Sequence, residues 1–376
     1  MASTPSDIPP EAPSLLTIDL AALRKNYRKI KSLAKDAACG VVVKADAYGI
    51  GAHRAVEALS AEGCDTYFIA TLDEARLVRQ VAPEATLYAL DSLLPGTADL
   101  FAEIDLRPIL GSVAEVEDWA ALARARGQRL PAAFHIDTGM NRLGLRAGDL
   151  DEIIQPPSPL EDFDISLVMS HLACADDPDN PRNETQRQTF DALRAKLPPV
   201  PASLANSGGV FLGPAYHYDM VRPGIALYGG RAAKLGGQTM EPVVRLEGRI
   251  LQVKQAEAGE TVGYGATRML KRATRIAIIA AGYADGYVRA LGSSDARDGG
   301  PVYFGDHEAP ILGRVSMDLI AVDVTGLPQE LTARGALVEL LGDHVGIDDL
   351  ADIAGTIGYE ILTGLGQRHH RVYLDE

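Results

Sequence analysis

The sequence predicts an N-terminal (β/α)8 barrel of the TIM type over residues 14–235 and a mostly β-strand domain over residues 236–376. The first observation behind this prediction is that short apolar runs alternate with helical patterns about eight times, at intervals of roughly 20 to 35 residues. The second is that the alternation stops near Gly236-Gly237, a possible linker, beyond which glycine-rich turns separate the apolar runs. A doubly wound open sheet is the alternative, but no GxGxxG follows the first strand.

The composition is that of a globular chain and narrows the classes of function. The 376 residues are 47% hydrophobic and 23% charged, with 36 basic and 51 acidic residues and a net charge of −15. Such a charge disfavours nucleic acids and anionic membranes as partners, and the longest apolar stretch, 276–281, is too short to cross a bilayer. The three cysteines, Cys39, Cys64 and Cys174, are widely spaced, which favours reduced thiols and a cytoplasmic location. The polar, proline-containing residues 1–13 lack the features of a signal peptide and are expected to be a loose tail.

The expected elements follow in order from apolar periodicity. The first expected element is a helix capped by Asp19, in which apolar residues recur every three or four positions from Leu20 to Leu33. The eight expected barrel strands are residues 41–43, 67–70, 86–90, 107–110, 132–136, 165–169, 202–205 and 219–221, with helices such as 112–126 and 184–196 between them. The second domain is expected to contain strands at 243–253, 275–281, 302–304, 320–324 and 337–341 and a helix at 347–354.

Lys44 is the first candidate functional residue, because it ends the apolar first strand in VVVKADAYG. Barrels of this type carry their active sites at the C-terminal ends of the strands, and a lysine placed there suits Schiff-base chemistry. The alternative interpretation is an ordinary lysine whose amine reaches solvent at the end of a strand.

Three further loops follow expected strands. Arg142, in DTGMNRLG, offers a planar fork that suits a carboxylate, and Asn206-Ser207-Gly208-Gly209 together with Arg222-Pro223-Gly224-Ile225 lie where such barrels bind phosphate. Ordinary glycine-containing turns are the alternative. His171 ends the sixth strand and could equally be a packed ring, and no histidine or cysteine spacing indicates a metal site. In the second domain, Tyr264, Tyr283 and the segment Ser316-Met317-Asp318 lie in glycine-rich loops that are weak signals individually.

Taken together, the segments VVKADAYG, HIDTGMNRLG, RPGIALYG, GYGAT, GYADGY and GRVSMD resemble, in this order, the fold-type III pyridoxal-phosphate enzymes and specifically the alanine racemases. The resemblance runs from about Thr17 to the C-terminus. It implies a barrel, a C-terminal β domain and a head-to-tail homodimer with two shared active sites.

The resemblance also implies roles for individual residues. Lys44 would hold pyridoxal 5'-phosphate and act as one base, and Tyr264 of the partner subunit would act as the second base on the opposite face of the substrate. The supporting set would be Tyr48, Asn206, Ser207, Gly224 and Ile225 at the cofactor, Arg222 at the pyridine nitrogen, Arg142 and Met317 at the substrate carboxylate, and His171, Tyr283 and Asp318 around them. Contacts from Tyr264 through His171 to the permanently charged Arg222 would lower the pKa of Tyr264 and so let it act as the second base.

Two positions depart from the family's pattern. His135 occupies the place where the family often has a carbamylated lysine, so the anion beside Arg142 must come from elsewhere, for example a bound chloride. The family's phosphate-side tyrosine is expected around Gly366-Gln367-Arg368-His369, where there is no tyrosine.

The function expected from the resemblance is therefore an alanine racemase that supplies D-alanine for peptidoglycan. A racemase of broader range that also accepts serine is the nearest alternative. A decarboxylase of the same fold would need an acidic residue where Arg222 stands, and a non-catalytic cofactor-binding barrel would not need Tyr264.

Overall fold

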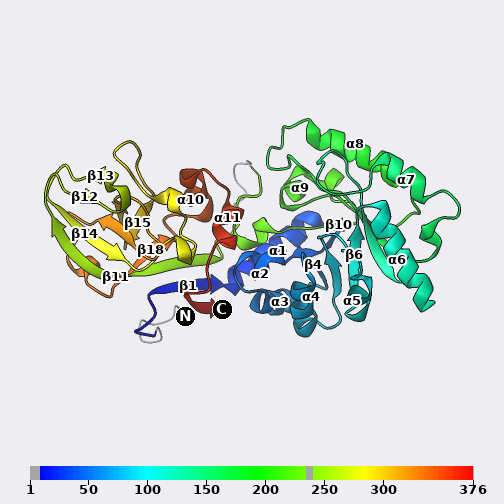
Figure 1. Cartoon of the computed structure of the whole chain (residues 1–376), viewed down its shortest axis with the longest axis horizontal. Helices are drawn as coiled ribbons and strands as arrows, with labels where there is room; N and C mark the ends of the chain where they lie inside the picture. Colours follow the sequence, from blue (N-terminus) through cyan, green and yellow to red (C-terminus); the bar gives the residue numbers. More distant parts are fainter. Residues whose placement is uncertain (1–8, 234–239, 376) are drawn as a thin grey trace.

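The computed structural model describes residues 9–233 and 240–375, which form a barrel and a β-rich domain side by side (Figure 1). Residues 1–8 of the expected tail and the expected linker Gly236-Gly237 lie outside the described residues. The chain therefore has the predicted architecture, a barrel followed by a mostly β-strand domain.

The barrel is built on parallel strands in sequence order. The seven strands of one sheet are β3 (Val41–Val42), β4 (Thr66–Ile69), β5 (Thr86–Ala89), β6 (Leu106–Leu110), β7 (Pro131–His135), β8 (Asp164–Met169) and β9 (Ala202–Ser203). The eighth strand, β10 (Met220–Val221), pairs with β2 (Ala38–Cys39) on one side. On its other side, the backbone N–H of Arg222 donates to the carbonyl of Ala205 at 2.8 Å. These hydrogen bonds join the two ends of the sheet, and each strand lies within two residues of its predicted bounds.

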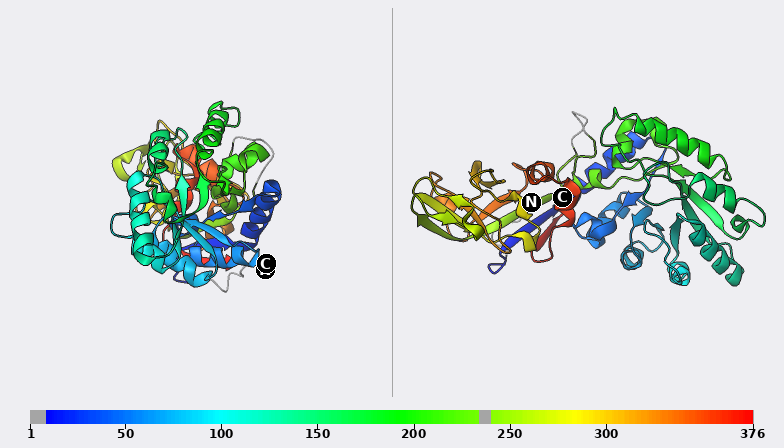
Figure 2. Two further views of the ribbon diagram at one scale, coloured as in Figure 1. Left: turned by 90° about the vertical axis from the view of Figure 1, so that its right-hand side faces the viewer. Right: turned by 45° about the horizontal axis from the view of Figure 1, so that its top comes forward.

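Helices surround these strands, as the left view of Figure 2 shows. They are α1 (Leu20–Ala34), α2 (Lys44–Tyr48), α3 (Ala52–Ala61), α4 (Leu72–Val81), α5 (Ala98–Glu103), α6 (Val113–Arg126), α7 (Ala147–Ile153), α8 (Arg182–Arg194) and α9 (Ser207–Leu212). The predicted cap of the first helix is confirmed, because the Asp19 carboxylate accepts a 2.7 Å hydrogen bond from the N–H of Ala22. Among the described residues, no helix combines the length and apolar character that crossing a membrane requires.

The C-terminal domain is a largely antiparallel β structure. Its strands are β11 (Val244–Ala256), β12 (Thr261–Val262), β13 (Arg268–Met269), β14 (Thr274–Ile279), β15 (Pro301–Phe304), β16 (His307–Pro310), β17 (Ile320–Asp323), β18 (Leu337–Leu341) and β19 (His370–Leu374). Two helices, α10 (Ile347–Ala354) and α11 (Gly358–Thr363), follow β18 and lie between the β strands and the barrel (Figure 1).

The chain begins in the second domain rather than in the barrel. Strand β1 (Ser14–Asp19) pairs antiparallel with β11 and parallel with β19, and the side chains of Leu16 and Ile18 are fully buried there. The first residues of the segment 14–235 therefore contribute to the sheet of the C-terminal domain. The domain boundaries inferred from the sequence stay predictions.

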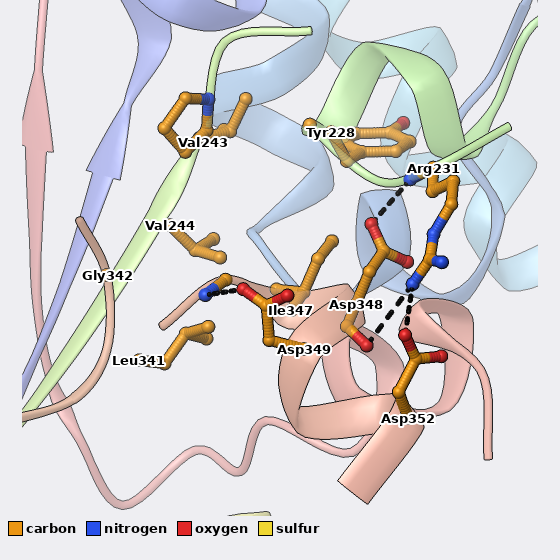
Figure 3. A pocket seen from close by; sticks show the side chains of 13 residues that line it. Tyr228, Arg231, Val243, Val244, Leu341, Gly342, Ile347, Asp348, Asp349 and Asp352 are labelled. Atoms are coloured by element: carbon orange, nitrogen blue, oxygen red, sulfur yellow. Dashed lines mark hydrogen bonds and ion pairs between the residues drawn. The ribbon is translucent and has the colours of Figure 1, made fainter. Parts of the chain in front are cut away.

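Contacts around a cavity of about 260 Å³ between the barrel and the C-terminal domain hold α10 beside the barrel (Figure 3). Arg231 lies in the loop after η4 (Ile225–Tyr228), and its backbone N–H donates to the Asp348 carboxylate at 2.7 Å. Its guanidinium pairs with Asp352 at 2.7 Å. These contacts tie α10, and with it α11, to the loop that follows the last barrel strand.

Candidate active site

A cavity of about 430 Å³ opens at the C-terminal ends of the barrel strands and gathers most of the predicted site residues. Its lining includes Lys44, Tyr48, His135, Arg142, His171, Asn206, Ser207, Arg222, Gly224, Ile225 and Tyr359. Every barrel residue singled out from the sequence as a site residue is therefore in one cavity, although these residues come from loops far apart in the chain.

Lys44 stands at the start of a left-handed turn. The φ angles of Ala45, Asp46, Ala47 and Tyr48 are between 52° and 56°, in the region that L-residues other than glycine avoid. Each such residue costs about 1–2 kcal/mol, so the surrounding contacts must hold the turn in place. The Asp46 carboxylate accepts from the N–H of Ala52 at 2.7 Å, and the Glu74 carboxylate accepts from the N–H of Ala45 at 2.6 Å. The strain is thus located directly after the candidate Schiff-base lysine.

A hydroxyl-lined cradle lies across the cavity at the loops after β9 and β10. The Ser207 hydroxyl accepts hydrogen bonds from the N–H groups of Gly224 at 2.8 Å and Ala226 at 3.3 Å. Asn206 caps α9 by accepting from the N–H of Gly209 at 2.9 Å. The cradle therefore combines small residues with the Ser207 hydroxyl, a combination that suits a phosphate group.

Two tyrosines form one wall of this cradle. The Tyr48 ring lies 6.0 Å from the ring of Tyr359, and burial raises the pKa of both phenols, that of Tyr359 to about 12. Both therefore remain neutral hydroxyl donors at neutral pH. Sequence reasoning missed Tyr359, because the family's C-terminal tyrosine was expected near Gly366. The segment Gly358-Tyr359-Glu360 at the start of α11 was the signal that could have located it.

Arg222 is a buried cation in an unusual environment. It is 3% exposed, and its guanidinium donates to the carbonyl of Ser170 at 2.6 Å and to the Ser203 hydroxyl at 2.5 Å. No carboxylate pairs with it within the described part of the chain. Burial lowers the pKa of Arg222 to about 9, so the side chain stays positively charged at neutral pH.

The charges of Arg222 and Arg142 act on the two histidines of the cavity. Burial and the charges of Arg222 and Arg142 lower the pKa of His135 to about 4 and hold the pKa of His171 well below its ordinary value. Both imidazoles are therefore neutral at pH 7. The His171 Nε2 lies 3.4 Å from the Asn206 amide nitrogen, and among the described residues no hydrogen bond joins its ring to Arg222.

The residues predicted from the second domain are not in this cavity. Tyr264, Tyr283 and Met317 are 71%, 42% and 52% exposed, and Asp318 pairs with Arg368 at 2.7 Å. The N–H of Tyr283 donates to the carbonyl of Ser316, so two of the three loops are in direct contact. The four side chains thus belong to an exposed surface of the same chain, and their part in a shared site stays a prediction.

Comparisons with known proteins agree with the architecture. A family model described as alanine racemase, N-terminal domain, matches residues 18–232, and one described as alanine racemase, C-terminal domain, matches residues 243–373. The chain is 45% identical over 377 residues to an alanine racemase of Brucella canis, covering 96% of this chain and 94% of that one. It is 44% identical over 364 residues to a protein of Mesorhizobium japonicum named alanine racemase, catabolic, with coverage of 96% and 94%.

A solved structure supports the same grouping. The crystal structure of alanine racemase from Bartonella henselae with covalently bound pyridoxal phosphate superposes with a TM-score of 0.92 at 38% identity. The match covers 96% of this chain and all of that one, so it includes both the barrel and the C-terminal domain.

Proposed function

Because the chain belongs to the alanine racemase family, we propose that it interconverts L-alanine and D-alanine with pyridoxal 5'-phosphate held at Lys44. The observation that carries this proposal is the charge of the cavity. In a chain of net charge −15, Lys44, Arg142 and Arg222 line one cavity, and Asp91 is the single carboxylate among its described lining residues. Such a cavity suits a ligand with both a phosphate and a carboxylate.

The close approach of Tyr48 to Gly224 also fits a cofactor site at these loops. A Cβ on Gly224 would lie 2.2 Å from the Tyr48 hydroxyl, so only glycine leaves room for the tyrosine beside the cradle. Ser207, Gly224, Ile225 and Tyr48 would bind the phosphate, and Tyr359, whose ring lies 6.0 Å from that of Tyr48, would add a second neutral hydroxyl. When bound, pyridoxal phosphate supplies an electron sink that makes the α-proton of an amino acid acidic.

Racemisation requires proton transfer on both faces of the α-carbon, and we assign the two bases accordingly. The Lys44 amine would take or return the α-proton on the face used by D-alanine. Tyr264 of the partner subunit handles the proton of L-alanine from the opposite face. Arg142 and the backbone of Met317 receive the substrate carboxylate, which orients the α-hydrogen toward these two bases.

Arg222 determines which reaction follows. Its guanidinium keeps its protons at neutral pH, so beside the pyridine nitrogen of a bound cofactor it would be a hydrogen-bond donor that does not protonate that atom. The cofactor would then supply a weaker electron sink, which would suppress transamination and decarboxylation. A decarboxylase of this fold would need an acidic group where Arg222 stands, and Arg222 therefore argues against that alternative function.

We further propose that two subunits pair head to tail, so that the exposed Tyr264, Tyr283, Met317 and Asp318 of one chain face the cavity of the other. The cytoplasm is the proposed location, and D-alanine for peptidoglycan is the proposed product. The similarity to a relative named catabolic supports a part in alanine breakdown as a second candidate role.

Loss of optical activity tests the proposal directly. Purified protein with added pyridoxal phosphate is incubated separately with a panel of L-amino acids, and chiral chromatography follows the D-isomers. Alanine is expected to racemise fastest. Faster conversion of serine would replace the proposed activity by a broader racemase, and no conversion of any amino acid would refute it.

A further inference from the structure

Gln186 of α8 is a buried side chain outside the cavity that holds the backbone next to His171. It is 1% exposed. Its amide nitrogen donates to the carbonyl of His171 at 3.0 Å, and its carbonyl oxygen accepts from the N–H of Ala173 at 2.8 Å. The carboxamide therefore bonds to the two backbone groups that flank Leu172, as a neighbouring strand would.

The same carboxamide reaches a second loop of the site. Its nitrogen also donates to the Thr138 hydroxyl at 3.0 Å, and that hydroxyl lies 2.8 Å from the hydroxyl of Ser170. Thr138 begins the loop that carries Arg142, and the carbonyl of Ser170 accepts from Arg222 at 2.6 Å. One side chain thus connects the segments that position the predicted carboxylate ligand, the histidine and the buried arginine.

At neutral pH, a carboxamide satisfies these partners and an ionised carboxylate does not. The carbonyl of His171 can only accept and the N–H of Ala173 can only donate, so one end of the side chain must carry a donor beside an acceptor. A carboxylate would place its charge against the carbonyl oxygen of His171, and an apolar side chain would leave all three groups without this partner. The three contacts together use both N–H donors and the acceptor of Gln186.

We propose that Gln186 is a positioning residue that fixes the loops carrying Arg142 and His171 relative to each other. Its effect on turnover rests on the proposed racemase function. Its effect on the loops does not, because the hydrogen bonds lie within this chain.

Gln186→Met preserves length and volume but removes all three hydrogen bonds. We expect faster amide hydrogen exchange in peptides covering residues 138–142 and 171–175, and a kcat for alanine about 10- to 100-fold lower, as misplaced groups cause. The matched control is Asn183→Leu, on the same helix, where Asn183 is also 1% exposed but donates to Asp177. The control is expected to lose stability without faster exchange at 138–142 and without the fall in kcat.

Gln186→Glu separates positioning from folding. A protonated carboxyl has one donor and one acceptor and can pair again with His171 and Ala173, whereas the carboxylate cannot. The ratio of its kcat to that of the wild type should therefore rise as the pH falls, and the ratio for Gln186→Met should stay flat.

Unchanged amide exchange and a kcat within twofold of the wild type in Gln186→Met would overturn the proposal. So would an Asn183→Leu variant that has the same unfolding free energy as Gln186→Met and shows an equal fall in kcat and equally faster exchange at residues 138–142. If the wild-type protein racemises no amino acid, the proposed function fails, while the exchange measurement on the same protein still decides the role of Gln186.

Discussion

The hydroxyl of Tyr48 occupies the space that a side chain on Gly224 would need, since a Cβ there would lie 2.2 Å from the phenol oxygen. The two residues come from the loops after the first and the last barrel strands. Their contact therefore joins the beginning and the end of the strand ring at the proposed phosphate position. A side chain at Gly224 therefore requires the Tyr48 ring to move.

Gly224→Ala is expected to displace Tyr48 and weaken cofactor retention, at a cost of about 1–3 kcal/mol in unfolding free energy. Retention is measured by the absorbance of bound pyridoxal phosphate during dialysis. Gly148→Ala is the control, because Gly148 lies in α7 with no atom within 4 Å of the added Cβ. Equal retention in the two variants would contradict the assignment of Gly224 to the phosphate cradle.

Lys44 is expected to carry the cofactor. Borohydride reduction of the holoenzyme followed by proteolysis and mass spectrometry should locate the pyridoxyl group on the peptide that contains Lys44. Lys31→Ala, at an exposed position of α1, should leave the label unchanged, whereas Lys44→Ala should remove both label and racemase activity. A label on any other lysine would exclude the proposed attachment.

Loss of the Arg222 charge is expected to change the products as well as the rate. Arg222→Glu should lower the racemisation rate by about 10²-fold or more, because it removes the buried positive charge and replaces it with a carboxyl group that can protonate the pyridine nitrogen. It should also produce pyruvate through transamination, which lactate dehydrogenase detects. Ser203→Ala removes one hydrogen bond of Arg222 and keeps its charge, so no pyruvate is expected from it. Pyruvate from neither variant would argue against contact between Arg222 and the pyridine ring.

Mixed dimers test whether each active site takes residues from two chains. Lys44→Ala and Tyr264→Ala should each be nearly inactive, but in a mixed dimer one site receives both changes and the other neither. With statistical mixing, half of the dimers are mixed and half of their sites are intact, so about a quarter of wild-type activity should return on co-refolding. No recovery, although native mass spectrometry detects mixed dimers, would falsify the shared site.

His135 is expected to contribute to acid sensitivity. Since burial and neighbouring cations lower its pKa from 6.5 to about 4, the folded protein favours the neutral imidazole. The unfolded chain binds the proton first as the pH falls, so this contribution to stability is complete above about pH 6.5 and lost toward pH 4. The loss amounts to roughly 3 kcal/mol.

His135→Gln should therefore flatten the fall in unfolding free energy between pH 6.5 and 4 in urea titrations. The control His53→Gln changes a side chain that is 60% exposed and should keep the wild-type slope. A wild-type slope in His135→Gln would show that other groups cause the acid sensitivity.

The sequence alone determined the elements and their order. Apolar runs at strand spacing predicted all eight barrel strands, and the cap at Asp19 and the helix 347–354 were predicted at their observed positions. Local periodicity suffices for this, because burial of one face repeats along each element. The barrel residues of the site were also predictable, because the C-terminal ends of parallel strands converge at one mouth.

The tertiary structure decided what depends on contacts between distant segments. It placed β1 in the sheet of the C-terminal domain and brought Tyr359 from α11 against Tyr48, and both contacts join segments that lie far apart in the chain. It also showed that Gln186, an unremarkable helix residue in the sequence, binds the backbone beside His171. A single side chain that joins two loops leaves no periodic signal, since its partners are determined only when the chain has folded.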